Sequence, residues 1–149
     1  MAFVINTGAV KVPLEDNLGR TFGYAVYVPS DVGIIERYQK GLSIISEMED
    51  SFKEIAEKVT PENVFEMIAK PCQYLKKFCD FVFGSGFYES AFSEINPFTE
   101  TPSGDHVCML VIQSIVEDIK DKSDKRKEKE SKYLAGYKNT AEPRGHQNA

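Results

Sequence analysis

The sequence has few of the residues on which catalytic and metal sites depend. Its 149 residues include no tryptophan, two histidines and three cysteines. His106 and His146 are forty residues apart, and neither belongs to a metal-ligand spacing such as H-E-x-x-H. Cys72, Cys79 and Cys108 form an odd set without a C-x-x-C pair, which favours free buried thiols in a reducing compartment. We therefore expect no metal, no cofactor and no disulfide framework.

Long apolar runs and an excess of positive charge are also missing. No stretch approaches the roughly 18 to 20 apolar residues that cross a bilayer, and residues 1–12 do not have the pattern of a signal peptide. The net charge is −5, so the summed field repels phosphate backbones. Residues 117–132 hold seven basic and six acidic side chains, which leaves the basic cluster at 125–127 little net charge. Membrane insertion, export and nucleic-acid binding are not expected, which indicates an intracellular protein.

Weaker signals for chemistry have simpler structural explanations. Cys108 and His106 are two residues apart on an expected helix, so they point to different faces and do not form a nucleophile–base pair. Gly84 and Gly86 begin a phosphate-loop pattern, but they follow an expected helix and no G-K-S/T follows them, which favours a helix stop. Carboxylates lie on polar helix faces, where nothing marks a catalytic pocket. We predict that the protein is not an enzyme, and keep a small enzyme with an unrecognised pocket as an alternative.

The N-terminal residues predict a β-hairpin over residues 3–28. Residues 3–12 are apolar and β-branched, residues 13–19 supply turn formers, and residues 20–28 are again typical of a strand. The second run alternates with period two, which places its side chains on two opposite faces. One face carries Phe22, Tyr24, Val26 and Val28, and the other carries Thr21, Gly23, Ala25 and Tyr27.

Apolar residues at steps of three and four predict two helices after the hairpin. The first begins at the capping segment 29–31 and has a nearly heptad seam, through which we expect self-association. The seam consists of Ile34, Tyr38, Gly41, Ile45, Met48, Phe52, Ile55 and Val59, widened by Ile35, Leu42 and Ile44. The second helix starts at residues 60–62, and Pro71 should kink or divide it. Its apolar stripe is expected at Phe65, Ile68, Cys72, Leu75, Cys79 and Val82.

The last part of the chain predicts a short helix at 87–92, a loop, and a final helix from residue 103. One face of the final helix carries Cys108, Val111, Ile112, Ile115 and Ile119. Charged residues dominate after Ile119, so residues 120–149 are either a solvated helical extension or a disordered tail. The predicted fold is a mainly α protein of the α+β type. A bundle of three to five helices packs on the hairpin in a single globular domain over residues 1–119.

Two segments resemble the tail assembly chaperones of long-tailed phages and prophages of Gram-positive bacteria. Residues 22–31 and 35–38 are similar to that family's aromatic strand, Pro-Ser/Thr-Asp cap and Arg-Tyr pair. Residues 83–86, followed by Phe87 and Phe92, are similar to its Phe-Gly-x-Gly junction before the last helix. The resemblance covers roughly residues 3–119, and the chain departs from the family pattern at an insertion over residues 96–100.

The resemblance implies a protein of the host cytoplasm that binds tape measure and tail tube proteins before and during tail assembly. It also implies a longer product of ribosomal frameshifting near the C-terminus. The residues it marks as structural or protein-contact candidates are Asp31, Arg37, Tyr38, Gly84, Gly86, Phe87 and Phe92. The alternative is a structural virion component, such as a tail-completion or connector protein, with the hairpin as an edge for strand addition.

Overall fold

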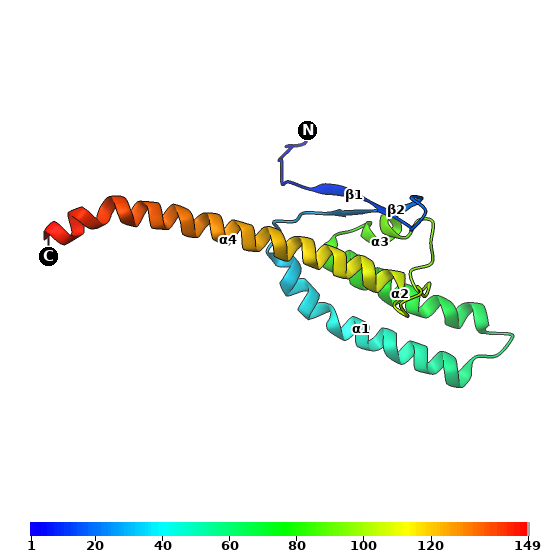
Figure 1. The fold of residues 1–149 in the computed structure, drawn as a ribbon. Helices are drawn as coiled ribbons and strands as arrows, with labels where there is room; N and C mark the ends of the chain where they lie inside the picture. The colour runs from blue at the N-terminus through cyan, green and yellow to red at the C-terminus, as the bar shows by residue number, and fades with distance from the viewer. Residues whose placement is uncertain (149) are drawn as a thin grey trace.

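A computed structural model describes the backbone of residues 1–148 and the side chains of residues 1–136. Two antiparallel strands, β1 (Val10–Glu15) and β2 (Thr21–Tyr27), precede four helices. The helices are α1 (Gly33–Lys58), α2 (Val64–Phe83), α3 (Phe87–Ala91) and α4 (Val107–Asn148). Figure 1 shows α1 and α2 side by side as an antiparallel pair, with the hairpin on the opposite side of α4. The predicted mainly helical α+β fold with an N-terminal hairpin is confirmed.

The hairpin is shorter than the sequence predicts. Val10 pairs with Tyr27 at one end of the sheet, and residues 3–9 are not a strand, so the predicted start was wrong. Strand pairing needs a partner, and β2 ends just before Pro29, which has no backbone N–H to donate. The predicted turn was too long, because Asp16 begins the turn and its carboxylate accepts the N–H groups of Leu18 and Arg20.

The α1 helix presents one face to α2. Its buried residues include Ile34, Gly41 and Met48 of the predicted seam. A Cβ at Gly41 would lie 3.0 Å from the Phe78 ring, so the glycine allows close approach of the two helices. Ile35 and Leu42 are exposed, so the predicted widening of the stripe was wrong at these positions. The predicted seam was also wrong at Phe52 and Val59, which are exposed. Ile35 and Leu42 lie on a side of α1 that is open to solvent, whereas Phe52 meets the Phe98 ring edge-on, with centroids 5.0 Å apart.

The α2 helix starts later than the capping pattern predicts. The backbone N–H of Thr60 donates to Oδ1 of Asn63 at 2.7 Å, which closes a turn before the helix begins at Val64. Pro71 lies buried inside α2, which it does not divide. The buried residues of α2 are Met67, Pro71, Leu75, Phe78, Cys79, Val82 and Phe83.

The predicted stripe of α2 was wrong at its first two positions. Phe65 is 88% exposed and Ile68 is 50% exposed, whereas Met67 and Pro71 are buried in their place. The reason is geometric, because the free end of the α1–α2 pair extends past the start of α4 and past the hairpin (Figure 1). The outer side of α2 is therefore exposed at Phe65 and Ile68.

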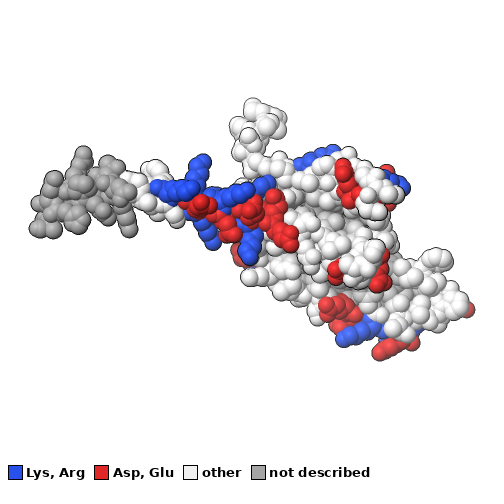
Figure 2. Space-filling view, viewed as in Figure 1, with Lys and Arg blue, Asp and Glu red and all other residues white. Residues whose placement is uncertain are grey.

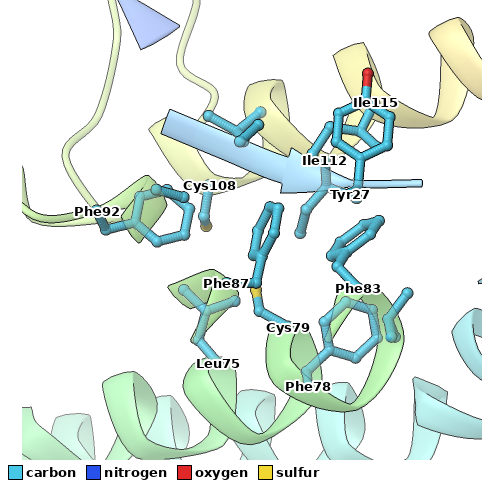
Figure 3. Close-up of a cluster of buried hydrophobic side chains, with 14 of the residues drawn as sticks. Tyr27, Leu75, Phe78, Cys79, Phe83, Phe87, Phe92, Cys108, Ile112 and Ile115 are labelled. Carbon is cyan, nitrogen blue, oxygen red and sulfur yellow. The ribbon is translucent and has the colours of Figure 1, made fainter. Parts of the chain in front are cut away.

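The core lies where β2, α2, α3 and α4 meet. Figure 3 shows Tyr27 from β2, Leu75 and Cys79 from α2, and Ile112 from α4 pointing into one cluster. Gly23 of β2 lies against the backbone of α3, since a Cβ there would be only 2.0 Å from the carbonyl oxygen of Ala91. The final helix begins at Val107, so the predicted start at residue 103 was wrong. Among its described side chains, those buried are Val107, Cys108, Val111, Ile112, Ile115 and Ile119, which confirms the predicted face from Cys108 to Ile119.

Beyond Ile119, α4 leaves the body of the molecule and continues to Asn148 (Figure 1). Every side chain over residues 120–136 is exposed except the half-buried Ser123. Acidic and basic side chains alternate along this segment (Figure 2). Among residues 1–148, no helix combines the length and the hydrophobicity that crossing a bilayer requires.

Candidate protein-binding surface

The two segments that carry the family resemblance meet at a polar junction. The Arg37 guanidinium donates from Nη2 to Oδ2 of Asp31 at 2.6 Å and from Nε to the carbonyl oxygen of Val82 at 3.0 Å. Asp31 also accepts the N–H of Gly33 at 2.8 Å, so it satisfies a donor in the first turn of α1. Hydrogen bonding to Arg37 holds the pKa of the Asp31 carboxyl below its usual value. The junction therefore joins the start of α1 to the end of α2.

Three further predicted site residues, Tyr38, Gly84 and Gly86, lie close in sequence to the residues of this junction. The Tyr38 ring meets the Phe78 ring edge-on, with centroids 5.8 Å apart. Gly84 and Gly86 have φ angles of 125° and 87°, which only glycine adopts readily, and they turn the chain from α2 into α3.

The two phenylalanines that follow the glycines lie in the core. Phe87 is 2% exposed and Phe92 is 8% exposed. The Phe87 ring lies 4.5 Å from the Phe83 ring, centroid to centroid. Both phenylalanines are therefore core residues and do not form an exposed contact patch.

Cys79 and Cys108 are buried thiols, and His106 packs against an aromatic ring. Burial raises the pKa of the Cys108 thiol to about 11 and raises the pKa of Cys79 further, so both stay protonated near neutral pH. The His106 ring packs edge-on against Phe98, with centroids 5.7 Å apart. Within the described part of the chain, no group of three or more His, Cys, Asp or Glu side chains is placed to hold a metal ion.

An apolar groove of about 750 Å³ lies between β1 and the first half of α4. A smaller hollow of about 250 Å³ extends it along the same two elements, toward Lys122. Both are lined by Val12 and Leu14 of β1 and by Val111 and Ser114 of α4. We call these two hollows together the β1–α4 groove.

The groove exists because only half of the hairpin's inner face is covered. Val10, Val12 and Leu14 pair with Tyr27, Ala25 and Gly23, and directly paired residues share one face of a sheet. The β2 half of this face is buried, with α3 packed against β2. On the β1 half, Val12 is still 40% exposed. The first half of α4 packs its buried stripe into the core. Val10 and Leu14 are half-buried against that core, so the inner face of β1 is left partly open, at Val12.

The charged side chains that line the larger hollow of the groove, its wide part, are all acidic. Glu15, Asp16 and Glu100 line this part, and no Lys, Arg or His side chain does. At the narrow end, Asp118 accepts hydrogen bonds from the Tyr27 hydroxyl at 2.6 Å and from Lys122 at 3.2 Å. The wide part is therefore electronegative, whereas the charge at the narrow end is locally compensated.

Two further apolar surfaces are exposed. Phe52, Val59, Phe65 and Ile68 lie toward the free end of the α1–α2 pair, which we call the α1–α2 tip. Phe3, Val4 and Ile5 lie on the N-terminal segment before β1. Neither of these two surfaces is a groove formed between two elements. The β1–α4 groove is therefore our candidate binding site.

None of the protein families, curated proteins or solved structures compared with the chain matches it.

Proposed function

We propose that the protein is a tail assembly chaperone of a long-tailed phage or prophage. It binds the tape measure protein and the tail tube protein in the host cytoplasm before and during tail assembly. The observation that carries the proposal is the partly uncovered inner face of β1, an apolar surface in a groove on an acidic chain. Exposed apolar surface of this kind is typical of protein interaction sites.

The junction described above also supports the proposal. The resemblance depends on one segment around Asp31 and Arg37 and on another around Gly84 and Gly86. These segments lie against each other, bridged by the hydrogen bond from Arg37 to Val82. A resemblance built from two distant segments is more informative when those segments form one structural unit.

The physical task of such a chaperone fits these surfaces. A tape measure protein is a long helical chain whose apolar faces would aggregate if they stayed bare. A groove lined by apolar side chains covers such a face by helix-in-groove contact. The net charge of −5 would keep the loaded complex dispersed.

Co-expression with the tape measure protein encoded beside this chain tests the proposal. We expect the tape measure protein to become soluble and to co-purify with the chain. The matched control is co-expression with an unrelated acidic helical protein of similar size. Unchanged solubility together with no recovered complex would refute the chaperone role. A slippery run near the stop codon, overlapping a second reading frame, would support the implied longer product.

A structural virion component is the second candidate, and the hairpin is the observation that favours it. The sheet has only two strands, so each strand is paired on one side only. An unpaired strand edge accepts another strand by backbone hydrogen bonding. Mass spectrometry of purified particles separates the two candidates, because a chaperone is absent from the finished particle and a connector is present.

A further inference from the structure

The β1–α4 groove has the dimensions of a short helix-binding site. From Val107 to Lys122, the residues of α4 that line it span about 22 Å at a rise of 1.5 Å per residue. The six residues of β1 span a similar length, about 20 Å in an extended strand. An occupant that lies along both elements would therefore have about four helical turns.

The floor of the groove favours a helical occupant over an extended one. The floor consists of side chains from β1, from the segment 95–102 and from one side of α4. The unpaired edge of β1 could hydrogen-bond an added strand, but an extended peptide lying across the side chains of the groove would leave its own backbone donors and acceptors without partners. A helix satisfies them within itself, so it can bury an apolar stripe without that cost.

The negative charge of the groove determines which charged side chains should lie beside the apolar stripe of that helix. Among the described side chains, neither Glu15 nor Glu100 forms an ion pair, and Asp16 uses its carboxylate in the hairpin turn. Positive side chains beside the apolar stripe would complement these carboxylates, whereas acidic flanks would be repelled.

We propose that the β1–α4 groove binds an amphipathic helix whose apolar stripe is flanked by Lys or Arg at the end that reaches Glu15 and Glu100. The inference deepens the proposed function, on which it rests, by giving the partner segment a chemistry. A second copy of this chain fits less well. Its exposed N-terminal segment, residues 1–9, carries no Lys or Arg, and its basic segment, residues 120–132, has no apolar side chain.

Two labelled synthetic peptides of about four helical turns test the proposal. Both carry the same leucine stripe at helical spacing, one with lysines on its flanks and the other with glutamates. Fluorescence anisotropy measures their binding to the full chain. We expect the lysine peptide to bind roughly tenfold more tightly than the glutamate peptide, a difference of about 1.4 kcal/mol.

Paired variants locate the binding site. The double variant Glu15→Lys/Glu100→Lys should lower the affinity for the lysine peptide about tenfold and raise the affinity for the glutamate peptide. The matched control Glu47→Lys/Glu49→Lys makes the same charge change on exposed residues of α1 and should leave both affinities nearly unchanged. Leu110→Ser removes apolar lining from the groove and should weaken both peptides, whereas Leu42→Ser on the exposed side of α1 should not.

Three results would overturn the inference. The first is equal affinity for the two peptides. The second is a change in the ratio of the two affinities that is as large in Glu47→Lys/Glu49→Lys as in Glu15→Lys/Glu100→Lys. The third is an oligomer of the free chain that Leu110→Ser dissociates in a sedimentation experiment, which would make a second copy the occupant. The co-expression experiment stays independent. If Glu15→Lys/Glu100→Lys still solubilises the tape measure protein, the groove is not the binding site, but the chaperone role stands. If the unmodified chain binds the lysine peptide but does not solubilise the tape measure protein, the groove binds helices, but the chaperone role fails.

Discussion

The two halves of α4 are stabilised by different interactions. Val107 to Ile119 has six buried residues that pack against α2, α3 and β2. Residues 120–136 bury almost nothing and are supported by exposed pairs one turn apart, such as Lys125–Asp121 and Lys132–Glu128. Packing of an apolar face is the larger source of helix stability, and exposed pairs add only a few tenths of a kcal/mol each. The body and the extension should therefore respond very differently to mutation.

Truncation of Phe78 should give the largest effect in the body. Its side chain is 1% exposed and lies between α1 and α2 against Tyr38 and Gly41. We expect Phe78→Ala to lower the free energy of unfolding by about 3–5 kcal/mol in a urea titration. Phe65→Ala is the matched control on the same helix, and its effect should stay within about 0.5 kcal/mol. Similar losses for both variants would show that the α1–α2 tip is covered in solution.

Replacing glycine by alanine should have opposite effects in the body and in the extension. A Cβ at Gly23 would lie 2.0 Å from the carbonyl oxygen of Ala91, so Gly23→Ala forces β2 away from α3 and should cost about 1–3 kcal/mol. A Cβ at Gly136 meets nothing within 4 Å, and Gly136→Ala should raise the helical signal in circular dichroism. A stabilised Gly23→Ala protein would show that α3 does not pack on β2 as described.

The hydrogen bond from Tyr27 to Asp118 ties the hairpin to α4 near the point where the two halves meet. This bond is the main reason that the pKa of Asp118 lies below its usual value of 3.8. A lowered folded-state pKa contributes stability that is present above that value and is lost as the pH falls through the folded pKa. We expect Tyr27→Phe to lower the free energy of unfolding by about 1 kcal/mol at pH 7.

The pH dependence separates this bond from simple packing. In urea titrations, the variant should lose less stability than the unmodified chain as the pH falls below 3.8, because it lacks the hydrogen bond that favours the ionised form of Asp118. Asp31 also has a lowered pKa, so part of the acid dependence should persist in the variant. An unchanged pH profile would mean that the Tyr27 hydroxyl does not bond to Asp118 in solution.

Periodicity predicted the parts of this fold that depend on neighbours close in the chain. The α4 face from Cys108 to Ile119 and the alternation in β2 needed only the local spacing of apolar residues. The errors came where a partner was required. Residues 3–9 have strand composition but no strand to pair with, and Phe65 has helical spacing but no element above it.

The candidate site was the part least accessible to sequence reasoning. The groove joins Val12 and Leu14 to Leu110 and Val111, about a hundred residues away, and no motif links these positions. The alternation of residues 10, 12 and 14 does place three apolar side chains on one face, but it does not reveal that this face is left partly open. Burial of each face is set by the tertiary packing of α3 and α4.

Removal of the extension should have the smallest effect of all. A chain that ends at Ser123 keeps the Lys122–Asp118 pair and every buried residue of α4. Because the deleted residues bury almost no surface over 124–136, the free energy of unfolding should change by less than about 0.5 kcal/mol. The total helical signal should fall with the deleted residues, while the urea midpoint stays in place. A loss above about 1 kcal/mol would mean that the extension packs against something, either this body or a second copy, and the contrast between the two halves of α4 would fail.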